Sequence, residues 1–216
     1  MAKYKYLLFD LDGTLTDSAE GITNSVAYAL EKFGIVTEDK STLNVFVGPP
    51  LVDAFMNFYG FSEDDAHKAV AFYRERFRDI GIFENSVYDG IIELLERLSS
   101  DGFELIMATS KPEEFAKRIA THFDFEKYFS HIVGATFDGK ISTKTDVINH
   151  ALSRAGITDK SAVIMIGDRH HDMEGAAEVG VDSIGVLYGY GDRAELEKAN
   201  ATYIAKTVND IRKFLI

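Results

Sequence analysis

The chain has 216 residues, 46% of them hydrophobic, which is enough for one sizeable core or for one core with a small second domain. Its 35 acidic and 23 basic residues give a net charge of −12, which repels a polyphosphate backbone, so we expect no nucleic-acid partner. The absence of cysteine excludes disulfides, thiolate metal sites and a cysteine nucleophile, and it fits a reducing cytoplasm. We expect no signal peptide and no membrane anchor, because no apolar stretch reaches the roughly 18 residues of a membrane span.

The first predicted strand covers residues 4–9 and ends at a pair of carboxylates. Asp10 and Asp12 lie two positions apart, so they share one face if the strand continues through them. Gly13 then supplies a turn at which the backbone can approach a ligand closely. Two carboxylates at close range repel, so either the pKa of one rises or a cation binds between them. The structural alternative is an ordinary turn, because Asp and Gly both favour turns.

Residues 16 to about 84 show helical periodicity and no strand-like alternation. One amphipathic helix is predicted within residues 22–33, another near residues 51–59, and a long one after a Ser62 cap. Between the first two, Gly48 and the two prolines that follow it break regular structure and predict a loop. This stretch therefore predicts a separate all-helical domain.

From residue 88 onward, short apolar strands alternate with helices. Alternation of this kind indicates a parallel sheet with helices on both faces, a Rossmann-like α/β fold. We therefore predict an α/β core domain of residues 1–15 and 86–216 with a helical cap domain of residues 16–85 inserted into it. The predicted strands of the second part are residues 103–108, 131–134, 162–166 and 183–187 and a short one at Tyr203; the predicted helices are 91–99, 113–122, 144–155, 173–179 and 194–199 and a last one after Tyr203.

Polar side chains follow two of these strands, at the sheet edge where ligands bind in such folds. Thr109 and Ser110 follow the strand of residues 103–108 and can offer hydroxyls to phosphate oxygens, although such residues are more often simple helix caps. Asp168 and Asp172 follow the strand of residues 162–166, and one of them could merely complement a helix dipole. Together with the first pair, they place four carboxylates at one edge.

Four clustered carboxylates require compensating charge. Carboxylate oxygens suit Mg²⁺, so a divalent metal is nearly implied. A phosphate group adds about two negative charges, so a lysine should also reach the site. Lys144, at a predicted helix start, is the best placed, with Lys140 and Lys111 as alternatives. We expect His170 and His171 at the rim and not as a metal pair, because neighbours on a helix point in different directions.

In their order along the chain these segments resemble the motifs of the haloacid dehalogenase superfamily of phosphatases. Asp10–Thr14 is similar to the first motif, Thr109 to the second, Lys144 to the third and Gly167–Asp172 to the fourth. The helical insertion resembles the type 1 cap of that family. The Gly48-Pro49 loop and the Tyr188-Gly189-Tyr190-Gly191 segment are most similar to the phosphoglycolate phosphatase branch.

The resemblance implies a two-step mechanism. Asp10 would attack phosphorus and form an aspartyl phosphate. Asp12 would protonate the leaving oxygen and then activate water. Mg²⁺ would be held by Asp10, by the backbone carbonyl of Asp12 and by Asp168, with Asp172 close by or bound through water. Thr109, Ser110 and Lys144 would bind the phosphate oxygens.

Three functions remain open after the resemblance is taken into account. The first is a Mg²⁺-dependent hydrolase of a small phosphomonoester such as phosphoglycolate or a nucleoside monophosphate, as in a 5'-nucleotidase. The second is a phosphomutase of the β-phosphoglucomutase kind, and the third is a phosphate-sensing regulator without turnover. Gly48 and Pro49 would close over the leaving group. We expect a small-molecule substrate, and the chain could be a monomer or a homodimer.

Overall fold

The computed structural model describes residues 3–216, which divide into two compact units. One unit comprises the chain up to Thr16 together with Val87–Ile216, and the other comprises Asp17–Ser86. Where the chain passes between the units, β2 (Thr16–Asp17) and β3 (Ser86–Val87) form a two-stranded sheet. The sequence pattern did not predict these two strands, since two residues are too few to show periodicity. The assignment of the units as core and cap domains stays a prediction.

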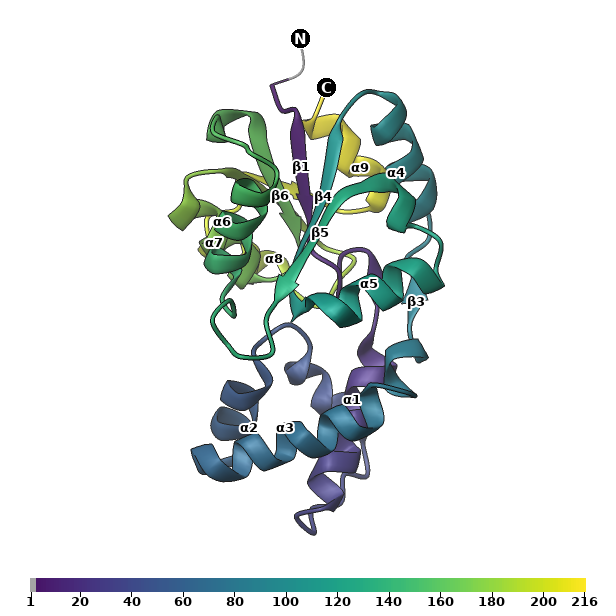
Figure 1. Ribbon diagram of the computed structural model, residues 1–216, viewed down its shortest axis with the longest axis vertical. Helices are drawn as coiled ribbons and strands as arrows, with labels where there is room; N and C mark the ends of the chain where they lie inside the picture. Colours follow the sequence, from purple (N-terminus) through teal and green to yellow (C-terminus); the bar gives the residue numbers. More distant parts are fainter. Residues whose placement is uncertain (1–2) are drawn as a thin grey trace. The chain divides into compact units, whose positions relative to one another are not determined.

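The larger unit is built on a parallel sheet, which confirms the predicted α/β fold class. Among the described residues the sheet has six strands in the order β5-β4-β1-β6-β7-β8, and Figure 1 shows its central strands side by side. Leu7, Leu8 and Phe9 of β1 are fully buried, because a parallel sheet is covered by helices on both faces. The strands are β1 (Tyr6–Phe9), β4 (Glu104–Pro112), β5 (Phe129–Ala135), β6 (Val163–Gly167), β7 (Asp182–Val186) and β8 (Tyr203–Ala205).

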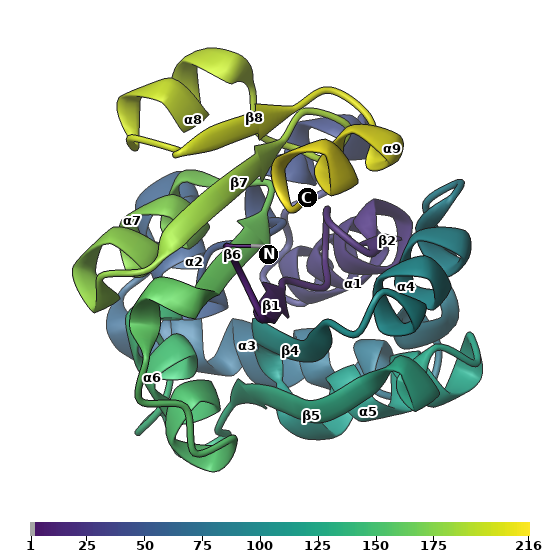
Figure 2. The ribbon, with the colours of Figure 1, turned by 90° about the horizontal axis from the view of Figure 1, so that it is seen from above.

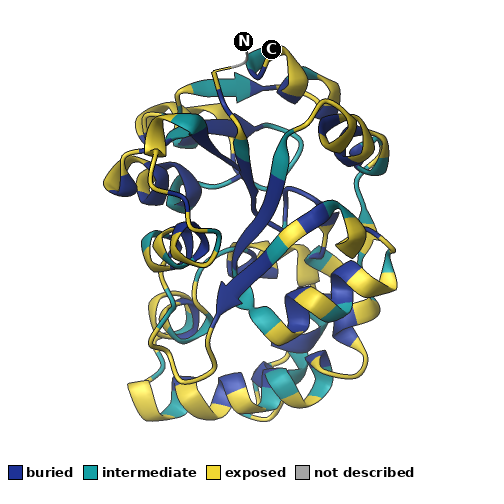
Figure 3. Cartoon of the chain, turned by 45° about the horizontal axis from the view of Figure 1, so that its top comes forward, coloured by how far each residue is buried: buried dark blue, intermediate teal, exposed yellow. Residues whose placement is uncertain are grey.

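Helices cover both faces of this sheet. Viewed from above, α6 and α7 lie on one face and α4 and α9 on the other (Figure 2). Their inward sides and the central strands are buried, and their outer sides are exposed (Figure 3). The α-helices are α4 (Ile91–Ser100), α5 (Glu113–His122), α6 (Lys144–Arg154), α7 (His170–Val179), α8 (Arg193–Lys198) and α9 (Val208–Ile211), and the 3₁₀ turns are η3 (Glu126–Tyr128), η4 (Lys160–Ala162) and η5 (Arg212–Phe214).

Two predicted boundaries in this unit lie three or four residues from the observed ones, and both are beside the candidate site. The strand predicted to end at residue 108 continues as β4 to Pro112, because β5 still pairs with it there after a register shift beyond Thr109. Helix α7 begins at His170 and not near residue 173. Its first turn is polar, so the apolar periodicity starts later than the helix itself.

The smaller unit is helical, as its periodicity predicted. Its helices are α1 (Ala19–Glu31), α2 (Leu51–Tyr59) and α3 (Glu63–Phe77), with 3₁₀ turns η1 (Lys40–Phe46) and η2 (Gly81–Phe83). The Ser62 hydroxyl accepts a hydrogen bond from the Asp65 amide, which confirms the predicted cap. Phe46 and Phe55 are buried with ring centroids 4.9 Å apart, so this unit has an aromatic core of its own. No helix of residues 3–216 combines the length and the apolar character needed to cross a membrane.

An ion pair joins the end of this helical unit to α3. The Arg76 guanidinium contacts both carboxylate oxygens of Glu84 at 2.7 and 2.8 Å, and the Glu84 carbonyl accepts a hydrogen bond from the Gly21 amide of α1. The hydrogen bonds from Arg76 lower the pKa of Glu84. A bidentate pair of this kind stabilises more than an exposed single contact does.

We expect Glu84→Gln to lower the free energy of unfolding by about 1 kcal/mol at pH 7. Because the pKa of Glu84 is depressed in the folded protein, this contribution is present above the ordinary Glu pKa and is lost as the pH falls through the folded value. Urea unfolding followed by circular dichroism over that pH range measures it. The exposed Glu31→Gln on α1 is the matched control, and a difference that persists in acid would contradict the assignment.

Candidate active site

Three buried carboxylates meet at the carboxyl end of the central strands. One oxygen from each of Asp10, Asp168 and Asp172 lies within 4.8 Å of the others, and each residue is at most 8% exposed. Asp10 directly follows β1 and Asp168 directly follows β6, and these two strands are neighbours in the sheet. Asp172 comes from the first turn of α7. The structure thus brings together three of the four predicted acids.

The backbone around Asp168 and Asp172 holds both side chains in place. Asp168 Oδ2 accepts a hydrogen bond from the Tyr190 amide at 2.8 Å, and Asp172 Oδ2 accepts one from the Arg169 amide at 3.1 Å. A Cβ atom at Gly13, whose φ is +81°, would collide with the Asp168 carboxylate, so the turn after β1 requires glycine. Cβ atoms at Gly189 and Gly167 would likewise collide, with Asp168 and Asp172 respectively.

Lys144 is the lysine that reaches the carboxylates. Its Nζ lies 2.9 Å from Asp10 Oδ1 and 2.7 Å from Asp172 Oδ1, and it donates a hydrogen bond to the Ala108 carbonyl at 3.1 Å. The side chain is buried although it stands at the first position of α6. Lys140, one of the alternatives, pairs instead with Asp138 on the surface.

Asp12 points to a different lysine. Its Oδ2 lies 2.6 Å from Lys111 Nζ, and both side chains are largely buried. The carboxylates of Asp10 and Asp12 therefore have separate cationic partners, which the two-residue spacing alone does not show. The role of the Asp12 carbonyl in metal binding stays a prediction.

The two hydroxyl residues lie at the end of the regular pairing of β4. Thr109 is buried, and its Oγ1 accepts a hydrogen bond from the Lys111 amide at 3.2 Å. Ser110 is half-buried beside it. Gly48, with φ +105°, and Pro49 belong to the helical unit, in the turn between η1 and α2. Their part in closing over a leaving group stays a prediction.

Burial and mutual repulsion shift the pKa values of this cluster. Burial, opposed by Lys144, raises the pKa of Asp10 to about 6, and burial together with Asp172 and Asp10 raises the pKa of Asp168. Burial by itself would lower the pKa of Lys144, but the two carboxylates beside it raise that pKa overall. One ammonium does not balance three carboxylates, so the cluster favours an additional cation.

The residues present fit a magnesium ion. They offer hard oxygen ligands in a buried setting, which is the ligand type that Mg²⁺ takes in proteins. Within residues 3–216, the buried Asp12 Oδ1 has no hydrogen-bond partner and so leaves a further oxygen lone pair unused at this edge. Asp10, Asp168 and Asp172 would hold the ion.

Two residues at the site were not predicted as site residues. The Tyr188 hydroxyl donates to the Thr14 carbonyl at 2.8 Å, and Lys111, named only as an alternative phosphate ligand, fixes Asp12. Tyr188 follows β7, so the rule that ligand sites lie beyond the carboxyl ends of strands could have pointed to it.

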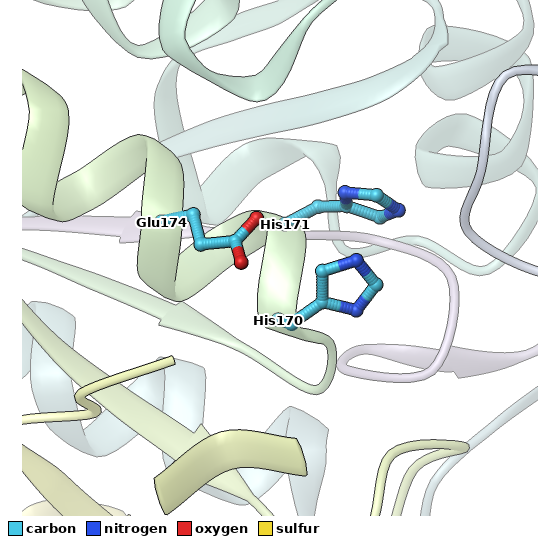
Figure 4. Close-up of side chains that lie close together, drawn as sticks. All are labelled: His170, His171 and Glu174. Carbon is cyan, nitrogen blue, oxygen red and sulfur yellow. The ribbon is translucent and has the colours of Figure 1, made fainter. Parts of the chain in front are cut away.

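The two histidines at the start of α7 lie close together, although neighbours on a helix were predicted to point in different directions. Their ring centroids lie 3.7 Å apart, and together with Glu174 they form a second group of side chains (Figure 4). His170 is the first residue of the helix, where no preceding turn restricts its side chain, and its Nδ1 lies 2.8 Å from Glu195 Oε1. That contact turns the His170 ring toward α8.

Comparison with known proteins identifies the family of this chain. A 5'-nucleotidase of Pseudomonas aeruginosa is 47% identical over 213 residues, with 99% of this chain and 96% of that protein covered. A crystal structure of a predicted phosphatase from Clostridium acetobutylicum superimposes with a TM-score of 0.95 at 53% identity, over 97% of each chain. The model of the haloacid dehalogenase-like hydrolases matches residues 7–186, so the chain belongs to that family, as its motifs indicated.

Other relatives of this chain are named for different activities. The tyrosine-protein kinase PtkA of Mycobacterium tuberculosis is 39% identical over 211 residues, which cover 97% of this chain and 72% of that protein. The phosphoglycolate phosphatase of Colwellia psychrerythraea matches at 25% identity. Proteins of the branch suggested by the sequence are therefore relatives at lower identity than the 5'-nucleotidase.

Asp168→Asn tests the electrostatic description of the site. The amide has the same shape but removes one charge from a buried acidic cluster, so with a chelator present we expect the Tm to rise by about 2–4 °C, equivalent to about 1 kcal/mol. Because the pKa of Asp168 is raised on folding, its charge costs stability above the ordinary Asp pKa, and the gain should disappear in acid.

Thermal unfolding in chelator and in excess Mg²⁺ measures this effect. Mg²⁺ should raise the Tm of the wild type more than that of Asp168→Asn, since the variant loses one ligand. The exposed Asp79→Asn should behave as the wild type does in both conditions. A variant that is less stable than the wild type in chelator would show that Asp168 is not under electrostatic strain.

Proposed function

We propose that this protein is a Mg²⁺-dependent phosphomonoester hydrolase in which Asp10 is the nucleophile. The observation that supports this most directly is the position of Asp10, which is buried beside two further carboxylates and ion-paired with Lys144. A carboxylate held in this way can form a covalent phosphoryl intermediate. The cysteine-free sequence suits the reducing cytoplasm, where we expect the enzyme to act.

In the first step, an Asp10 oxygen attacks phosphorus and the bond from phosphorus to the leaving oxygen breaks. Asp12 gives its proton to that oxygen as it leaves. Lys144 lies beside the Asp10 oxygen, so its ammonium is placed to contact the transferring phosphoryl group, and Thr109 and Ser110 can donate to the remaining oxygens. A Mg²⁺ held by the three aspartates would supply further positive charge against the phosphoryl oxygens.

In the second step, water replaces Asp10 on phosphorus. Asp12, now deprotonated, accepts a proton from that water, the bond between phosphorus and the Asp10 oxygen breaks, and phosphate is released. Lys111 is ion-paired with Asp12 and Lys144 with Asp10, so acid and nucleophile are positioned by different cations. This separation suits two carboxylates with different tasks.

For the substrate, the comparisons favour a nucleoside 5'-monophosphate over phosphoglycolate. The relative named 5'-nucleotidase is 47% identical to this chain over nearly its whole length, whereas the phosphoglycolate phosphatase is 25% identical. Both reactions use the same nucleophile and acid, and the leaving group would be selected by the helical cap, which we propose to be of type 1. The alternative function is a phosphomutase of the β-phosphoglucomutase kind, and the assay described next distinguishes it from a hydrolase.

Release of inorganic phosphate from a panel of metabolites tests the reaction. We expect turnover of nucleoside monophosphates with Mg²⁺ and none with chelator, and we expect Asp10→Asn to reduce kcat by about a thousandfold or more. Circular dichroism should show that the variant is folded. Asp79→Asn serves as the control. Undiminished turnover by Asp10→Asn would contradict the covalent mechanism, and interconversion of sugar phosphates without release would indicate the mutase.

Pro49→Ala tests the proposed specificity loop. If Pro49 contacts the leaving group, its removal should change kcat/KM for one substrate relative to another by about tenfold. The chemical step, which is the same for all substrates, should change little. Ratios of kcat/KM for nucleoside monophosphates and phosphoglycolate measure this. Val36→Ala, an exposed change in the same helical unit, is the control. An unchanged ratio would remove Pro49 from the specificity loop.

A further inference from the structure

A second group of metal-ligating side chains lies on α7, outside the aspartate cluster. His170, His171 and Glu174 each present one ligand atom, and these three atoms lie within 4.8 Å of one another (Figure 4). Glu174 follows the histidines by four and three residues, which are the spacings at which side chains of a helix meet. The histidines are half-buried and Glu174 is exposed, so an ion can enter from solvent.

An independent contact orients one of the rings as a metal ligand. His170 Nδ1 lies 2.8 Å from Glu195 Oε1 on α8. Histidines that bind metals usually donate their other ring N–H to a carboxylate, which fixes the tautomer and raises the basicity of the ligating nitrogen. With Nδ1–H donating to Glu195, the lone pair of His170 lies on Nε2 and is available to an ion.

Glu195 is itself fixed by further contacts. Its Oε1 also accepts hydrogen bonds from the His170 amide and from Arg169 Nε, each at 2.8 Å. The charge of Arg169 is thus paired, and it does not oppose a cation as an isolated charge would. The start of a helix disfavours cations, but the Glu174 and Glu195 carboxylates offset that field.

We propose that His170, His171 and Glu174 form a binding site for a transition-metal dication of the Zn²⁺ class. Two imidazoles and one carboxylate are a ligand set that Zn²⁺ accepts, with water completing the coordination. The aspartate cluster offers oxygen ligands only, which suits Mg²⁺. The chain would therefore carry two neighbouring metal sites with different ligand preferences.

The test is calorimetric titration of the full chain with Zn²⁺ in saturating Mg²⁺, which occupies the aspartate cluster. We expect one Zn²⁺ to bind per chain, and we expect His171→Ala and Glu174→Gln each to weaken binding about tenfold or more. Glu195→Gln keeps all three ligands and should also weaken binding, because a neutral amide no longer raises the basicity of the His170 ring as the carboxylate does. His67→Ala on α3 is the matched control and should bind as the wild type does.

Co²⁺ provides a second readout, since its visible absorption distinguishes nitrogen-containing from all-oxygen coordination. We expect the absorption of a nitrogen-containing site in the wild type and its loss in His171→Ala. The proposal is overturned if no Zn²⁺ binds, if all variants bind Zn²⁺ equally, or if the Co²⁺ spectrum shows oxygen ligands alone. Circular dichroism shows whether each variant is folded. If His171→Ala is unfolded, the Zn²⁺ affinity of Glu174→Gln tests the proposal in its place. None of these measurements depends on phosphatase turnover.

Discussion

The candidate active site depends on one buried ammonium group. Lys144 lies between Asp10 and Asp172, and without it these two buried carboxylates would lose their ion-pair partner, which is strongly destabilising because it leaves buried charge uncompensated. The position of this lysine is set by where α6 begins. Thr143 and Asp146 form a capping box that fixes the first turn of the helix, so a local hydrogen-bond pattern places the charge on which the site relies.

The order of the strands explains why distant parts of the sequence meet here. β1 lies between β4 and β6, and Phe9 is level with Met107 on one side and Ile166 on the other. The residues that follow these three strands therefore emerge at the same edge, which puts Asp10 beside Thr109 and Asp168. Parallel strands make this possible because all of their carboxyl ends point the same way.

The sequence predicts the fold class and the meeting of Asp10, Asp168 and Asp172 at one sheet edge, because both depend on patterns that are local in the chain. Apolar strands that alternate with helices indicated the parallel sheet, and the family match confirmed the identification made from the motifs. Side-chain partners were not predictable in the same way. The pairing of Asp12 with Lys111 and the close approach of the two histidine rings depend on rotamers and on neighbouring elements, which residue spacing does not specify. The substrate stays a proposal for the same reason.

The glycines packed around the acids have a consequence for how the site binds. Because Gly13, Gly189 and Gly167 bring the backbone against the side chains of Asp168 and Asp172, these carboxylates have little space in which to rotate. Their conformational entropy is lost when the chain folds, not when an ion or a phosphate group arrives. Association at this edge of the sheet then requires little additional ordering, so more of the interaction energy remains as affinity.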